Sequence, residues 1–100
     1  MLRRMDAASF RSSLAALTPP TELDPLLTAL WLAWNGRWEE AHDAVNRCEG
    51  TEGAWLHAHL HREEGDLHNA DYWYRRAQRE GPTHGLIEER EAMLQAWTEN

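Results

Sequence analysis

Two turn glycines, Gly36 and Gly65, stand 29 residues apart, and the residues around them repeat at the same interval. A shift by this interval superposes Leu27 on Leu56, Ala29 on Ala58, Ala41 on Ala70 and Arg47 on Arg76. Internal periods of roughly 20–50 residues are typical of stacked helical repeats. The sequence therefore predicts two copies of one helical hairpin, hairpin 1 over residues 22–49 and hairpin 2 over residues 51–82.

The apolar residues recur at helical spacing along the whole chain, and no segment shows sustained alternation with a period of two, so every predicted element is a helix. Asp24 and Pro25 suit the start of the first helix of hairpin 1, as its cap and its first-turn residue. Two further helices are predicted outside the hairpins, over residues 6–17 and 83–97. Because stacked hairpins leave their end faces uncovered, these two helices are the natural caps. We therefore expect a single all-α domain over residues 1–100, with five to six helices.

Hairpin 2 resembles a tetratricopeptide repeat. The residues that carry the resemblance are Ala58 seven positions before Gly65, then Ala70, Tyr74, Ala77 and the closing Pro82. Hairpin 1 matches more loosely, because Gly53 stands where the family has proline, and the period of 29 is short for the family. The chain also resembles small uncharacterised bacterial proteins that share a stretch like LHREGDLxNAxYWYRRA. This second resemblance implies no activity.

The resemblance to tetratricopeptide repeats implies a concave groove, lined by the first helix of each hairpin, that holds a peptide. In hairpin 2 the residues at the groove positions include Trp55, His59, Arg62 and Glu63. A tryptophan and an arginine on one face are typical of a contact surface. The leading functional hypothesis is therefore a non-enzymatic module that binds a protein or peptide through this short groove.

The corresponding face of hairpin 1 is too apolar to be exposed on a soluble monomer. It carries Leu23, Leu26, Leu30 and Trp34. The helix over residues 6–17 has a matching stripe that includes Phe10, Leu14 and Leu17. We therefore expect this helix to fold back over the groove of hairpin 1, leaving only the Trp55 end open.

His57, His61 and Glu64 lie at positions i, i+4 and i+7, and so share one face of a helix. Two histidines one turn apart can bind a metal, and the carboxylate could be a third ligand. A second interpretation is acid–base chemistry at the same residues. The third is a polar pair packed against the next helix and hydrogen-bonded to Asn69 or Tyr72. The rival functional hypothesis is thus a small-molecule-binding protein or a metal-dependent enzyme.

Arg75, Arg76 and Arg79 form a basic run in the second helix of hairpin 2. Surface ion pairs, such as one between Asp71 and Arg75, account for such a run on an exposed helix. The alternative is a site for a carboxylate or phosphate, which arginine binds with two parallel hydrogen bonds.

The net charge of −7 argues against nucleic acid or an anionic membrane as the main partner, because both attract clustered positive charge. Cys48 is the only cysteine, so neither an intrachain disulfide nor a cysteine-based zinc site is expected. The first residues lack the apolar run of a signal peptide, and a cytoplasmic protein is predicted. No cofactor is predicted. The last functional alternative is a homo-oligomeric structural subunit, such as a homodimer, joined through exposed tryptophans.

Overall fold

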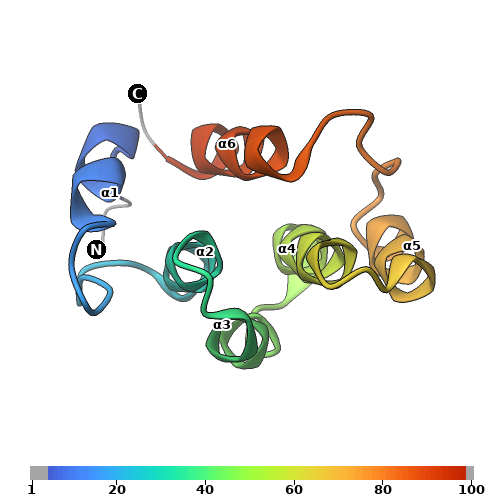
Figure 1. Cartoon of the computed structure of the whole chain (residues 1–100), viewed down its shortest axis with the longest axis horizontal. Helices are drawn as coiled ribbons and strands as arrows, with labels where there is room; N and C mark the ends of the chain where they lie inside the picture. Colours follow the sequence, from blue (N-terminus) through green and yellow to red (C-terminus); the bar gives the residue numbers. More distant parts are fainter. Residues whose placement is uncertain (1–4, 99–100) are drawn as a thin grey trace.

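A computed structural model describes residues 5–98, which form six α-helices and no β-strand (Figure 1). The helices are α1 (Ala7–Ser13), α2 (Pro25–Trp34), α3 (Trp38–Val45), α4 (Gly50–Glu63), α5 (Leu67–Arg76) and α6 (Leu86–Trp97). The predicted all-α class is therefore confirmed. None of the helices in this range is long and apolar enough to cross a membrane.

The turns at Gly36 and Gly65 have the same structure. Both glycines adopt a positive φ, +73° and +88°, which only glycine reaches without steric cost. In each turn the N–H of the residue after the glycine donates to a carbonyl five residues earlier, as in a Schellman motif. These bonds run from Arg37 N to Leu32 O at 3.0 Å and from Asp66 N to His61 O at 2.9 Å. The 29-residue interval therefore corresponds to a repeated turn between α2 and α3 and between α4 and α5.

The inner face of the molecule is made by α2 and α4, and α6 lies across both of them (Figure 1). α3 lies on the opposite side of α2 and α4 from α6. Between these layers lies the core, whose largest fully buried side chains include Leu27, Leu30, Trp31, Leu56, Leu60, Met93, Leu94 and Trp97. α6 therefore supplies the third layer that closes the core.

The prediction that residues 6–17 cover the groove is wrong in its main point, because the covering helix is α6. Phe10 is fully buried, with its ring edge against Trp34 at 5.7 Å, but Leu14 is half-buried and Leu17 is 90% exposed. α1 also ends at Ser13, where Leu14 N bonds to Arg11 O in a tighter turn. At 1.5 Å per residue, a helix of this length reaches only about 10 Å and covers one end of α2, whereas α6 is long enough to cross both α2 and α4.

Candidate metal-binding site

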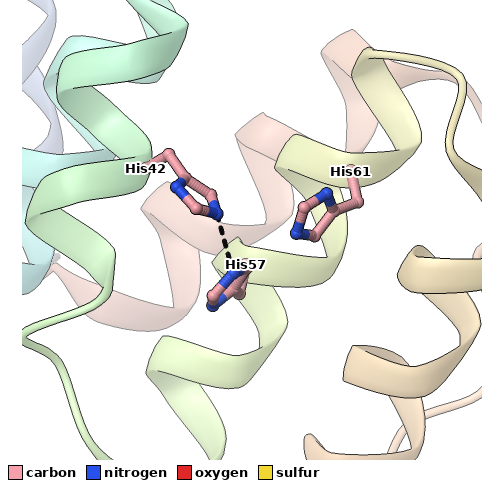
Figure 2. A group of neighbouring side chains, drawn as sticks. All are labelled: His42, His57 and His61. Carbon is pink, nitrogen blue, oxygen red and sulfur yellow. Dashed lines mark hydrogen bonds between the residues drawn. The ribbon is translucent and has the colours of Figure 1, made fainter.

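Three histidine side chains from two hairpins meet on the side of α4 that faces α3. His57 and His61 lie one turn apart on α4, with their rings stacked at a centroid distance of 5.0 Å. His42 extends from α3, and its Nε2 lies 3.0 Å from Nε2 of His57 (Figure 2). Each of the three rings offers a nitrogen within 4.8 Å of the others. His42, His57 and His61 form the histidine cluster.

Two tryptophans hold the rings of the histidine cluster from either side. Trp73 of α5 stacks on His57 at 3.8 Å, with an angle of 10° between the ring planes. Trp38 of α3 stacks on His42 at 4.9 Å and 8°. The indole of Trp38 is itself fixed, because its Nε1 donates to the carbonyl of Leu60 at 2.7 Å. The rings of His57 and His42 are thus oriented by packing.

The electrostatic surroundings keep His57 neutral at neutral pH. Burial of its ring, together with repulsion from His42 and His61, lowers its pKa from 6.5 to about 4. Neutral imidazole is the form that binds a metal. His61 has a different partner, because its Nδ1 lies 2.6 Å from a carboxylate oxygen of Glu64. This bond leaves Nε2 of His61 as the nitrogen available to an ion.

The donor set suits a borderline transition metal such as zinc. Nitrogens bound to one tetrahedral zinc lie about 3.3 Å apart, given Zn–N distances of about 2.0–2.1 Å. The His42–His57 pair is already near that spacing. His61 would supply the third nitrogen, since each of the three rings offers one within 4.8 Å of the others. The bond between Glu64 and His61 is the outer carboxylate–histidine contact that commonly orients a metal ligand.

Sequence reasoning found part of this site. His57 and His61 do share one face of α4, as predicted, and Glu64 at the C-cap of this helix bonds to His61 but does not join His57. The predicted partners Asn69 and Tyr72 are wrong, since the two histidines contact His42, Trp73 and Glu64. His42 was missed, and no sequence signal could have indicated it. It reaches the cluster only because α3 stacks against α4.

The predicted peptide groove of hairpin 2 is closed by α6. Trp55 and His59 are buried, and Arg62 is partly buried. All three side chains are hydrogen-bonded to the carboxylate of Glu89 on α6. The contacts to the Glu89 carboxylate are Trp55 Nε1 at 3.0 Å, His59 Nδ1 at 2.7 Å, Arg62 Nη1 at 3.0 Å and Tyr74 Oη at 2.6 Å. Glu63 lies 3.8 Å from Arg90, also on α6. The expectation that this end of the groove is open is therefore wrong.

Glu89 was not singled out from the sequence, yet its buried carboxylate contacts four side chains. Burial by itself raises the pKa of this carboxyl group, but the hydrogen bonds from His59, Tyr74 and Trp55 outweigh burial and lower it to about 2. The sequence did not distinguish Glu89 from its neighbours, because Glu88 and Glu91 lie beside it in the same amphipathic helix. Only the crossing of α6 over α4 reveals its role.

The three arginines of the basic run do not converge. The guanidinium of Arg79 lies 3.6 Å above the ring of Trp55, whereas that of Arg76 lies 5.3 Å from the ring of Trp73. Arg75 is exposed. A joint anion site of all three is therefore not formed.

Comparisons of this chain with models of protein families, with curated proteins and with solved structures gave no match. The assignment of function therefore rests on the geometry of the histidine cluster and its surroundings.

Proposed function

We propose that this protein binds one transition-metal ion, zinc in the first instance, through His42, His57 and His61. The observation that supports the proposal is the convergence of three imidazoles from two helices, with ligand atoms within 4.8 Å of one another. Three protein nitrogens leave the fourth position of a tetrahedral zinc open to water or to a small molecule. The function proposed is thus that of a metal-dependent, ligand-binding protein.

The surroundings of the histidine cluster also favour this proposal. A purely structural role would be served by apolar side chains, because burying imidazoles removes polar groups from water. Here His57 and His61 are buried at 6% and 7% exposure, with a hydrogen bond to another histidine and to Glu64 respectively. A metal bound to Nε2 of both His42 and His57 would displace the proton that lies between these nitrogens, and that proton would move to Nδ1 of the imidazole that carried it.

Zinc titration by calorimetry, with cobalt(II) as a spectroscopic substitute, tests the proposal. We expect one ion per chain and the visible absorption of tetrahedral cobalt. Replacing a partner in the outer shell of a metal costs about 10–100-fold in affinity, so Glu64→Gln should fall in that range. His42→Ala, His57→Ala and His61→Ala should each cost more than that.

The matched control is His68→Ala, which removes an exposed histidine of α5 outside the cluster. Its zinc affinity should equal that of the unaltered protein. The proposal fails if zinc does not bind, or if His68→Ala weakens binding as much as His42→Ala does. Circular dichroism of each variant would show whether a loss of binding reflects a loss of fold.

Protein binding is the second candidate, and one observation favours it. The face of α2 and α4 does hold a helix, although that helix is α6 of the same chain. A partner that uses Trp55, His59 and Arg62 would have to displace α6. Hydrogen exchange of the native protein tests this, because a displaceable α6 exchanges its amides by local opening. Exchange of α6 only through global unfolding would contradict it.

A further inference from the structure

A cavity of about 340 Å³ adjoins the histidine cluster, because His57 lines it, whereas His42 and His61 do not. It lies between the link from α3 to α4, the first turn of α4 and the inner side of α5. The residues that line it include His57, Trp73, Arg76, Glu49 and Thr51. A volume of this size accommodates a small organic molecule.

His57 has one nitrogen left for a ligand in this cavity. Its Nε2 is bonded to His42, and its Nδ1 has no hydrogen-bond partner among residues 5–98. The buried polar atoms without a partner in this range are His59 Nε2 and Arg90 Nε, so Nδ1 of His57 reaches solvent-filled space. His61 differs, because Glu64 occupies its Nδ1. Metal-bound histidines commonly place a carboxylate or carbonyl on the second nitrogen, and for His57 none is supplied by residues 5–98.

The charges around the cavity select the kind of ligand. Arg76 brings a guanidinium, and the first amides of α4 near Thr51 lack a side-chain cap at Glu49, so both favour an anion. Glu49 places one negative charge on the same wall, which disfavours a doubly charged phosphate. The indole of Trp73 and the neighbouring aliphatic side chains of Val45 and Ala54 suit an apolar body.

We propose that this cavity binds a small organic monocarboxylate, held between Arg76 and the Nδ1 edge of His57. The inference rests on the proposed function, because the carboxylate would complete the outer shell of a metal-bound His57. Zinc on Nε2 leaves the proton of His57 on Nδ1, where it can be donated to the carboxylate. Metal and carboxylate should therefore bind with positive coupling, each strengthening the other.

The test is a titration of the full chain with benzoate, followed by the amide and imidazole signals in nitrogen-15 NMR spectra, with and without zinc. Benzamide, which has the same shape but no charge, and inorganic phosphate are the control ligands. Benzoate should shift the signals of Thr51, Arg76 and the His57 ring. Arg76→Gln should weaken benzoate about 10–100-fold, the cost of a hydrogen bond to a charged group. Arg75→Gln, which removes a neighbouring charge outside the cavity, should leave it unchanged.

The outcomes separate this inference from the proposed function. Zinc binding without benzoate binding overturns the inference alone. Benzoate binding that depends on Arg76, in a protein that binds no zinc, supports the carboxylate site and overturns the metal proposal. Benzamide or phosphate binding as tightly as benzoate overturns the assignment to a carboxylate. If Arg75→Gln and Arg76→Gln weaken benzoate binding equally, the attraction is non-specific and the proposed carboxylate site is refuted.

Discussion

Substitution of Glu89 by glutamine should destabilise the fold strongly, although the two side chains have the same shape. Oε1 of Glu89 accepts from His59 and Arg62, and Oε2 accepts from Trp55 and Tyr74. Glutamine replaces one of these oxygens with an NH₂ donor. His59 and Tyr74 can adapt by changing tautomer or turning the hydroxyl, but Trp55 and Arg62 can only donate. In either orientation of the amide, its NH₂ group therefore faces Trp55 Nε1 or Arg62 Nη1, neither of which can accept a hydrogen bond.

Two estimates of the cost agree. A buried donor left without an acceptor costs about 1–3 kcal/mol, and more when a charged partner is involved. The lowered pKa of Glu89 gives an independent value. The difference between its ordinary value of 4.5 and about 2 in the folded protein is worth about 3 kcal/mol. Glu89 is 1% exposed, so solvent screening does not reduce this figure. We expect Glu89→Gln to lose about 3 kcal/mol at neutral pH.

Urea and thermal unfolding, followed by circular dichroism, measure this loss. For a domain of about 100 residues, 3 kcal/mol corresponds to a fall of about 12–24 °C in melting temperature. The matched control is Glu91→Gln on the same helix, where the carboxylate pairs with Arg11 at the surface and 40% exposure. That substitution should cost at most about 1 kcal/mol. A loss for Glu89→Gln equal to that of Glu91→Gln would refute the role given to the buried carboxylate.

The same carboxyl group predicts a pH dependence. Because its folded pKa is lowered, its stabilising contribution is fully present above about pH 4.5 and is lost as the pH falls towards about 2. The unaltered protein should therefore lose about 3 kcal/mol more across this range than Glu89→Gln does. Parallel stability curves for the two proteins between pH 4.5 and 2 would contradict the assignment.

Three further substitutions test the fold. Gly65→Val should cost more than 1 kcal/mol in urea unfolding, because valine is strained at the φ of +88° even though open space surrounds the site; an unchanged melting temperature would show that the turn is drawn wrongly. Phe10→Ala should cost about 3–5 kcal/mol and Leu17→Ala less than about 0.5 kcal/mol, since only Phe10 is buried; equal losses would contradict the placement of α1. Trp38→Phe should cost about 1 kcal/mol by removing the bond to Leu60 O, and an unchanged unfolding midpoint would argue against that bond.

Features that depend on neighbours along the chain could be predicted from the amino-acid sequence. The 3.6-residue period fixed the helices, and the requirement for a positive φ fixed glycine at both hairpin turns. The face shared by His57 and His61 also follows from helix geometry alone. These features are predictable because a helix places residues three and four positions apart side by side, whatever surrounds it.

The tertiary structure decided which helix faces meet. His42 joins the histidine cluster only because α3 stacks on α4, and Glu89 closes the groove only because α6 crosses α4. Residues 6–17 and α6 both carry apolar residues at helical spacing, so the pattern of apolar residues did not indicate which of them covers hairpin 1. The longer α6 spans both α2 and α4, whereas α1 is too short for more than one end. The packing that removes the most apolar surface from water is the most stable. The buried area depends on helix length and crossing angle, which a pattern of apolar residues does not specify.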